Sequence, residues 1–399
     1  MNVAGSQQRT FLELAAQLRP HWRRDRNLPA RLQSLLASRR AFGSRDRRLY
    51  RELLYTTLRY LPWIEPWLDR DPDQAARRVA WLAADSPATE RFRAALVGDW
   101  PPTPPRLADK AAQLGETSIP LPEWFREACP AAFEPEQADA LLARAPLWLR
   151  LQTDAPADVT AEFDQLGWRW ETSSILPTAL RLAGDVDVTK TSAFLGGRVE
   201  IQDLGSQLLL EAAGIAAGEH WLDACAGAGG KTLQLARLLG ASGRVDAHDI
   251  RPAALDELAA RARRAQLDSI RILRPPVADT YDGVLVDAPC SGSGTWRRAP
   301  HLKWTTTPEQ IEAAAATQRE LLGRFAAHVR PGGRLIYATC SLSHRENEDV
   351  IRAFLATHPD FRAEPPRRNF GFAGGELGLT ILPARHDTDG FFVATLRRD

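Results

Sequence analysis

The sequence predicts an α/β fold: a doubly wound, mostly parallel sheet in its second half, preceded by an all-α domain and a small α/β subdomain. From about residue 200 onward, apolar strand-like runs alternate with segments of helical periodicity. That order produces a parallel sheet with helices on both faces. Residues 7–96 show helical spacing of apolar residues, and the stretch near 147–200 mixes short strands with one amphipathic helix.

Length and local composition suggest where the domains divide. A chain of 399 residues exceeds what one core ordinarily holds. The proline-rich stretch WPPTPPRL at 100–107 is typical of a stiff connector, and strand composition begins with LWLRLQ at 147–152. We expect an all-helical domain over 1–128, a small α/β linker subdomain over 129–199 and the large α/β domain over 200–399.

Charge is distributed unevenly along the chain. Residues 1–60 contain thirteen arginines against four acidic residues, whereas the whole chain has a net charge of only +1. A basic concentration at one end indicates a polyanionic partner such as nucleic acid. The alternative is a solvated helix face in a protein that prefers arginine, since the whole chain contains only four lysines.

The sequence offers no sign of a membrane span or a metal site. No apolar run reaches the ~18 residues that a bilayer crossing requires. The start, MNVAGSQQRT, lacks the pattern of a secretory signal. The cysteines at 129, 225, 290 and 340 are too far apart for zinc-ligand spacing. A cytoplasmic protein without a bound metal is therefore expected.

The first motif is LDACAGAGGKT at 222–232, in which a strand runs into a glycine-rich loop that opens a helix. Glycines let a ligand approach the backbone, and the helix N-terminus favours an anionic group. Asp249, after the next strand, is placed to accept hydrogen bonds from ribose hydroxyls. Alone, this pattern fits NAD, a methyl donor or a nucleotide. A triphosphate loop is disfavoured because Cys225 stands where that loop needs a glycine.

Two further motifs place cysteines at the ends of predicted strands. VLVDAPCSGSGTWRRAPHLKW at 284–304 contains Asp287 and Cys290, and YATCSLSHRENEDV at 337–350 contains Cys340. In a doubly wound sheet, ligands bind at the carboxyl ends of strands around the switch in strand order. We therefore expect both thiols and the aspartate to converge on the glycine-rich loop.

The set DACAGAGGKT, DAPCSGSGTWRR with KW, and TCSL with ENE resembles the bacterial rRNA cytosine-5 methyltransferase family, the RsmB/Sun/Nop group. The likeness runs from LWLRLQ and VEIQDLGSQLL to DGFFVATLRR at 389–398, and the arginine-rich segment 42–60 resembles a NusB-like RNA-binding domain. The resemblance implies a class I methyltransferase fold, S-adenosylmethionine as methyl donor, 16S rRNA as the RNA partner and a monomeric enzyme.

The same resemblance assigns roles to individual residues. Cys340 would be the nucleophile, Cys290 would assist product release and Asp287 would act beside them. The residues expected to hold S-adenosylmethionine are Cys225, Ala226, Gly227, Ala228, Gly229, Gly230, Lys231, Asp249, Asp279 and Asp287. The chain departs from the family pattern at Ala228, where the family has proline, at Gln152 in place of asparagine, in the short segment before Asp279, and at His301, which replaces an acid.

The implied chemistry needs covalent help, because C5 of cytosine is a poor nucleophile. A thiolate added at C6 makes C5 electron-rich. Negative charge then develops at O2 and N3, and a protonated Asp287 or Lys303 is expected to stabilise it. The target base must be unpaired or flipped out. Arg297, Arg298, Lys303 and Trp304 are predicted to contact phosphate and stack on a base, although a surface loop with a packed tryptophan is the alternative.

Two other functions remain open at this point. DNA cytosine methyltransferases carry the nucleophile in a Pro-Cys motif, which here would be Cys290. The flanking sequence favours RNA. A non-catalytic RNA-binding assembly factor would have lost Cys340 or the glycine-rich loop, and this chain keeps both.

Overall fold

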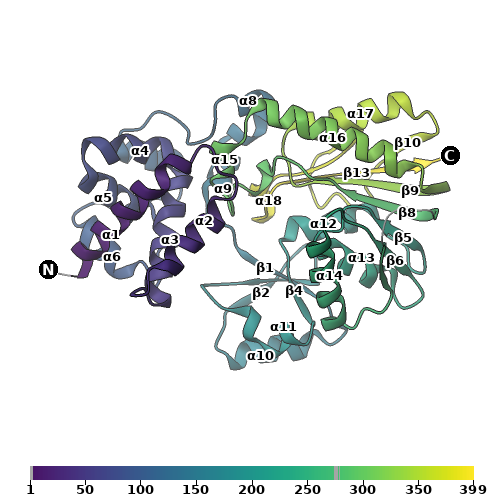
Figure 1. Ribbon diagram of the computed structural model, residues 1–399, viewed down its shortest axis with the longest axis horizontal. Coiled ribbons are helices and arrows are strands. Elements are labelled where there is room, and N and C mark those ends of the chain that lie inside the picture. The colour runs from purple at the N-terminus through teal and green to yellow at the C-terminus, as the bar shows by residue number, and fades with distance from the viewer. Residues whose placement is uncertain (1–2, 274–276, 278) are drawn as a thin grey trace. The chain divides into compact units, whose positions relative to one another are not determined.

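The computed structural model describes residues 3–273, 277 and 279–399, which divide into two units (Figure 1). The helical unit comprises residues 1–144 together with 295–307, and the α/β unit comprises 145–294 together with 308–399. The division differs from the boundaries expected at 128 and 199. Residues 129–144 and the segment 295–307 pack with the helices, and the small sheet shares a unit with the large one.

Amphipathic helices pack around their apolar stripes to make the helical unit. In α3, Leu49, Leu53 and Leu58 are buried while arginines occupy the opposite face. Pro62 lies in the first turn of α4, where its missing N–H costs no hydrogen bond. The helices are α1 (Val3–Leu18), α2 (Leu28–Ser38), α3 (Ser44–Arg59), α4 (Leu61–Arg70), α5 (Pro72–Leu82), α6 (Glu90–Val97), α7 (Leu107–Leu114), α8 (Phe125–Ala128), α9 (Pro135–Leu142) and α15 (Leu302–Thr305).

The small sheet of the α/β unit is antiparallel, with strand order β2-β3-β1-β4. Its strands are β1 (Leu147–Leu151), β2 (Trp170–Thr172), β3 (Ala179–Leu182) and β4 (Val199–Ile201), and its helices are α10 (Pro156–Gln165) and α11 (Ser192–Leu195). Leu149, Leu180 and Val199 face Val159 and Phe163 of α10 in a separate apolar core.

The large sheet has the order β11-β12-β13-β9-β8-β5-β6-β7, with β10 paired to β13. Strands β7, β6, β5, β8 and β9 run parallel, and the C-terminal strands close the sheet antiparallel. The strands are β5 (His220–Asp223), β6 (Arg244–Ala247), β7 (Ile270–Ile272), β8 (Tyr281–Asp287), β9 (Val329–Thr339), β10 (Phe361–Glu364), β11 (Gly374–Gly375), β12 (Gly378–Ile381) and β13 (Phe391–Arg398).

Helices cover both faces of this sheet, so the predicted α/β fold class is confirmed (Figure 1). Alternate residues along each strand point to opposite faces: Leu285 and Ile336 pack with α12 and α13, whereas Val284 and Tyr337 pack with α16 and α17. The helices of this unit are α12 (Leu204–Ala213), α13 (Gly230–Leu239), α14 (Pro252–Arg264), α16 (Pro308–Ala326), α17 (Glu348–Thr357) and α18 (Pro383–His386).

Strand order reverses between β5 and β8. From β5 the chain moves outward to β6 and β7, and then returns to place β8 on the other side of β5. A switch of this kind opens a crevice beyond the carboxyl ends of the two strands. In the part of the chain that the structure describes, none of the helices has both the length and the apolar character needed to cross a bilayer.

Replacing Gly283 with alanine should destabilise the α/β unit. A Cβ atom on this β8 residue would lie 2.3 Å from the buried indole of Trp221. Overpacking of this kind costs about 1–3 kcal/mol of unfolding free energy, measurable by urea denaturation. Gly323→Ala is the matched control, because the nearest atom to its Cβ, in His358, is 3.8 Å away. Since Gly323 lies inside α16, this control should gain up to ~1 kcal/mol. Equal stability of the two variants would contradict the packing described.

Candidate active site

The three motifs meet at the carboxyl edge of the parallel strands, beside the switch in strand order. β5 ends at Asp223, β8 at Asp287 and β9 at Thr339. Asp223 is opposite Leu285 in the β5–β8 pair, and Asp287 is opposite Ala338 in the β8–β9 pair. These registers place the loops that follow the three strands next to one another, as the sequence predicts.

The glycine-rich loop, residues 224–229, turns sharply between β5 and α13. Gly227 and Gly229 have φ angles of 53° and 89°, in the left-handed region that favours glycine. A Cβ on Gly229 would lie 2.7 Å from Leu258, whereas one on Gly230 would meet no atom within 4 Å. The loop thus leaves open space at the first residue of α13, where helix N–H groups favour an anionic group.

Asp249 supports the loop and presents a carboxylate beside it. Its Oδ2 accepts a hydrogen bond from the Gly227 N–H at 2.8 Å, and Arg251 donates to both carboxylate oxygens at 2.9 and 3.0 Å. Burial pushes the pKa of Asp249 upward, but these hydrogen bonds and the Arg251 charge bring it below its usual range. An ionised carboxylate here is suited to accept hydrogen bonds from the two hydroxyls of a ribose.

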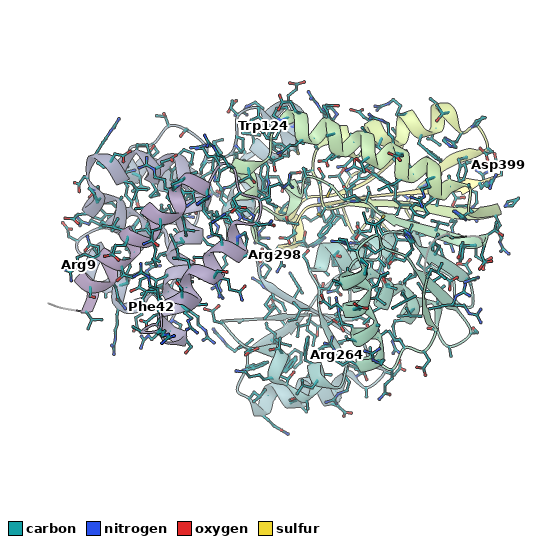
Figure 2. All side chains as sticks on the ribbon, in the orientation of Figure 1. Arg9, Phe42, Trp124, Arg264, Arg298 and Asp399 are labelled. Atoms are coloured by element: carbon teal, nitrogen blue, oxygen red, sulfur yellow. The ribbon has the colours of Figure 1, made fainter. Side chains whose placement is uncertain are left out.

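Arginines of the small sheet and of α14 donate hydrogen bonds to carbonyls at this loop and stabilise it. Arg261 donates to the Ala228 carbonyl at 2.6 Å and to the buried Glu200 at 2.8 Å. Arg264, labelled in Figure 2, donates to the other oxygen of Glu200. Arg150 of β1 donates to the Gly230 carbonyl at 3.3 Å, and burial lowers the pKa of Arg150 to about 9. Guanidinium groups therefore hold two carbonyls, that of Gly230 at the start of α13 and that of Ala228 in the loop, where the family has proline.

Lys231 and Asp287 form an ion pair between the first turn of α13 and the end of β8. Lys231 Nζ lies 2.8 Å from Asp287 Oδ2. Burial alone would lower the pKa of Lys231, but the charge and hydrogen bond of Asp287 raise it, and the Cys340 sulfur contributes in the same direction. Because Asp287 is engaged with a cation, the geometry favours Lys231 over a protonated Asp287 as the donor to a developing anion.

The sulfur atoms of Cys290 and Cys340 lie 3.3 Å apart. The thiol contact with Cys340 raises the pKa of Cys290 well above its usual range, together with burial and the nearby Glu346 carboxylate. Cys225, in the glycine-rich loop, is a third thiol of this edge. Burial, reinforced by the carboxylates of Asp223, Asp287 and Asp249, raises the pKa of Cys225 to about 12. Cys225 is therefore poorly suited to act as a thiolate.

Asp223 lies beneath the loop and is fully buried. Its Oδ2 accepts a hydrogen bond from the Thr232 hydroxyl at 2.7 Å, while Oδ1 has no hydrogen-bond partner. Burial is the main cause that raises the pKa of Asp223 to about 7. This carboxyl group titrates near neutrality at the base of the proposed donor site.

Asp279 lies at the opposite edge of the sheet, which corrects its assignment to the donor. It lies two residues before Tyr281, the first residue of β8, and eight residues before the end of that strand at Asp287. Its side chain pairs with Arg271 at 3.2 Å, and its carbonyl contacts His328 at 2.9 Å. A strand of that length separates its two ends by roughly 20 Å, so Asp279 cannot reach a ligand at the glycine-rich loop.

The residues predicted to contact RNA lie in the segment 295–307 of the helical unit. Lys303 is 1% exposed, and its ammonium donates to the carbonyls of Arg59 and Pro120 at 2.7 and 3.1 Å. Arg297 is 2% exposed and donates to the Arg144 carbonyl at 3.2 Å. Their donors are directed at the protein's own backbone, so both side chains anchor the segment. This burial corrects the RNA contacts predicted for Arg297 and Lys303, and with them the role of Lys303 in stabilising a base.

Trp304 and His301 also anchor the segment 295–307 to the rest of the helical unit. The Trp304 indole donates to the Leu58 carbonyl at 2.6 Å, and the buried His301 ring contacts the Arg26 carbonyl at 3.1 Å. Trp304 is half-buried, so the tryptophan is packed as in the alternative interpretation of this loop. Arg298, labelled in Figure 2, is exposed and stays a predicted RNA contact.

Three features of the site were not expected from the sequence. Arg150 and Arg261 reach the loop carbonyls from distant positions in the chain, and no local motif announces them. Glu346 is fully buried between the two cysteine loops. Its signal in the sequence is the ENE triplet at 346–348 that the family resemblance included, which begins five positions after the serine that follows Cys340.

Comparison with known proteins identifies the group to which this architecture belongs. Residues 212–397 match the family described as 16S rRNA methyltransferase RsmB/F. The "Probable ribosomal RNA small subunit methyltransferase B" of Synechocystis is 33% identical, over 73% of this chain and 70% of that protein. The "Ribosomal RNA small subunit methyltransferase B" of Xanthomonas campestris is 34% identical, over 69% of this chain and 66% of that protein.

A solved structure supports the fold. The methyltransferase homolog protein from Pyrococcus horikoshii is 26% identical, and the alignment covers 66% of this chain and 90% of that one with a TM-score of 0.58.

Removing Arg261 should weaken binding of S-adenosylmethionine. Arg261→Ala frees the Ala228 carbonyl and removes one of the two arginines that neutralise Glu200. Charge-assisted hydrogen bonds contribute about 1.5–3 kcal/mol, so the Kd measured by calorimetry should rise by roughly 10-fold or more. Arg263→Ala, at an exposed position of the same helix, should leave the Kd unchanged. An unaltered Kd in Arg261→Ala would exclude the bracing role.

Asp223 should make stability depend on pH. Its pKa is about 7 in the folded protein against 3.8 without burial, so the folded state binds the proton more tightly. Its stabilising contribution is complete below about pH 4 and is lost as pH rises through about 7, at up to ~1.4 kcal/mol per pH unit. In urea denaturation at pH 5 and pH 8, Asp223→Asn should lose less stability between the two pH values than the unaltered chain. Identical losses would contradict the assignment.

Proposed function

The chain belongs to the RsmB/F family of 16S rRNA methyltransferases, and from this premise we propose that it methylates C5 of a cytosine through a covalent bond from Cys340 to C6. S-adenosylmethionine is the proposed methyl donor and 16S rRNA the proposed substrate. The observation that carries the proposal is the 3.3 Å separation of the Cys290 and Cys340 sulfurs beside the glycine-rich loop.

The described residues fit the donor in charge and shape. The open space at Gly230 gives the backbone access that a close ligand needs, and Asp249 offers acceptors for ribose hydroxyls. Asp287, at the end of β8, contributes negative charge for a sulfonium or an ammonium group. When bound, the donor supplies a methyl group on a positively charged sulfur, which an electron-rich carbon can attack.

Cys340 supplies the nucleophile in the first step. Its thiolate bonds to C6, the electron pair of the C5–C6 double bond moves to the C4–C5 bond, and the C4–N3 pair moves to N3 and is shared with O2. The resulting enamine is electron-rich at C5. Lys231 interacts with the Cys340 sulfur through its positive charge. The same ammonium group is placed to stabilise the negative charge as it passes from sulfur to the ring.

Cys290 acts when the product is released. The Cys340 sulfur is the first cause of the raised pKa of Cys290. Once that sulfur is bonded to carbon it carries no negative charge, so the pKa of Cys290 falls. The Cys290 thiolate can then take the C5 proton. The C5–H electron pair re-forms the double bond as the bond between Cys340 and C6 breaks, and the Cys340 thiolate is regenerated.

The alternative in which Cys290 attacks, as in DNA cytosine methyltransferases, is less well supported. The negative charge of Glu346 near Cys290 raises the pKa of this thiol and so opposes formation of a thiolate there. Lys231 is the cation that interacts with Cys340. A non-catalytic assembly factor would have no need for two adjacent thiols and a paired lysine.

RNA is the partner that the helical unit favours. Arginines are exposed around the N-terminal half of α3 and the loop before it, namely Arg40, Arg45, Arg47, Arg48 and Arg51. A cationic surface of this kind binds phosphates without reading sequence. We assign it the role predicted for the NusB-like region, that of holding structured RNA while an unpaired cytosine enters the site.

Two cysteine variants test the chemistry. Cys340→Ala should abolish methyl transfer from labelled S-adenosylmethionine to 16S rRNA, because no thiolate remains to activate C5. Cys290→Ala should form the bond at C6 but release product slowly, so a protein–RNA adduct stable to denaturant should accumulate. Cys129→Ala, at a buried position of the helical unit, is the control and should behave normally. Full methylation by Cys340→Ala would refute the nucleophile assignment.

A further inference from the structure

Glu346 is an ionisable side chain with no exposure to solvent, and the mechanism above does not use it. It ends a 3₁₀ turn, His344–Glu346, between the Cys340 loop and α17. The hydrogen bonds that its carboxylate accepts come from uncharged groups, the N–H and hydroxyl of Ser291, the hydroxyl of Ser341 and the side-chain amide of Gln318. Burying a carboxylate is energetically costly, so the buried Glu346 needs a structural or functional explanation.

The first consequence of these bonds concerns the loop that carries Cys290. Glu346 Oε1 accepts from the Ser291 N–H at 2.8 Å and from the Gln318 amide at 3.0 Å. The same amide group of Gln318 donates to the Pro289 carbonyl at 3.0 Å. The residues on both sides of Cys290 are therefore tied to one carboxylate.

The second consequence concerns the loop that carries Cys340. Glu346 Oε2 accepts from the Ser341 hydroxyl at 2.6 Å. The adjacent Asn347 accepts from the Thr339 hydroxyl at 2.7 Å and donates to the Ser341 carbonyl at 3.0 Å. Glu346 and Asn347 together fix the residues on both sides of Cys340, as Glu346 and Gln318 do for Cys290.

The same carboxylate also influences charge at the two thiols. Ionisable residues near Cys290 include Cys340, Glu346 and Tyr337, whose hydroxyl donates to the Glu346 carbonyl at 2.6 Å. The cation of the site, Lys231, pairs with Asp287 and interacts with Cys340. The charge of Glu346 thus contributes to the raised pKa of Cys290, and Lys231 contributes positive charge near Cys340.

We propose that Glu346 is a positioning residue that holds the two cysteine loops at contact distance and places a negative charge near Cys290, so that Cys340 is the thiol that attacks. The inference rests on the proposed function for the roles of the two thiols. It adds the reason that two neighbouring cysteines of one site behave differently. The carboxylate does not touch the base or the donor, and it acts through the loops that it joins.

Glu346→Gln is the variant that tests this role, because it keeps the size of the side chain and removes the charge. Peptide-resolved mass spectrometry after brief exposure to iodoacetamide, without RNA, reports the reactivity of each thiol. Cys290 should be alkylated about 10-fold faster than in the unaltered chain, because removal of the neighbouring negative charge lowers the pKa of this thiol. The kcat for methyl transfer should fall by about 100-fold, roughly 2.7 kcal/mol of barrier, while the KM for RNA and the Kd for S-adenosylmethionine change little.

Matched variants keep the test decisive. Glu312→Gln, which removes an exposed carboxylate paired with Arg345, should change neither alkylation nor kcat. If Glu346→Gln does not fold, Ser291→Ala with Ser341→Ala removes the hydroxyl donors and leaves the charge. This double variant should lower kcat by loosening the loops and leave Cys290 slow to react.

The inference is overturned if Cys290 alkylation in Glu346→Gln and kcat both stay within twofold of the unaltered chain, or if the double serine variant retains full kcat. The alkylation result does not depend on methylation. If the unaltered chain fails to methylate cytosine, the proposed function fails while the effect of Glu346 on the thiols is still measured.

Discussion

The register between β8 and β9 is the constraint on which the site depends. Asp287 of β8 lies opposite Ala338 of β9, so Cys290 and Cys340 leave the sheet from equivalent places on neighbouring strands. A slip of one residue would exchange the two faces of a strand and move Leu285 and Ile336 out of their shared core. Burial on both sides of the sheet fixes the register, and the register brings the sulfurs to 3.3 Å.

Around this contact, charge is distributed asymmetrically. Lys231 and Asp287 form an ion pair near Cys340, and the buried Glu346 accepts hydrogen bonds from the residues that follow Cys290 and Cys340. The glycine-rich loop, with Asp249 and the bracing arginines, completes the site. In the proposed reaction, a cationic donor would meet the carboxylates and a base would meet the ammonium group, and the same strand ends would hold both the donor and the nucleophile.

Local sequence was sufficient to predict the features that depend on chain-neighbouring residues. Alternating strands and helices indicated the parallel sheet, and the positions of Asp287, Cys290 and Cys340 at strand ends indicated their convergence. Contacts between distant segments could not be predicted in this way. Arg150 and Arg261 reach the glycine-rich loop from 70 to 80 residues before it and about 30 after it only because the small sheet and α14 fold back on it.

The corrected predictions share one physical cause, which is that residue type was used where burial decides the role. Lys303 and Arg297 have the chemistry of phosphate ligands, but in segment 295–307 their donors satisfy backbone carbonyls of the helical unit. Asp279 follows β7 in sequence, yet the chain has by then crossed to the other edge of the sheet. In a doubly wound sheet the ligand site lies at the carboxyl ends of the strands, and Asp279 lies at the amino end of β8.

The central claim is that one particular sulfur bonds to the pyrimidine ring, and trapping that bond tests it most directly. RNA that carries 5-fluorocytidine at the target position blocks proton loss from C5, so the covalent intermediate should persist. After digestion of protein and RNA, mass spectrometry should locate the modified nucleotide on the peptide that contains Cys340. A nucleotide found on the Cys290 peptide, or on neither peptide after methyl transfer has occurred, would contradict the account.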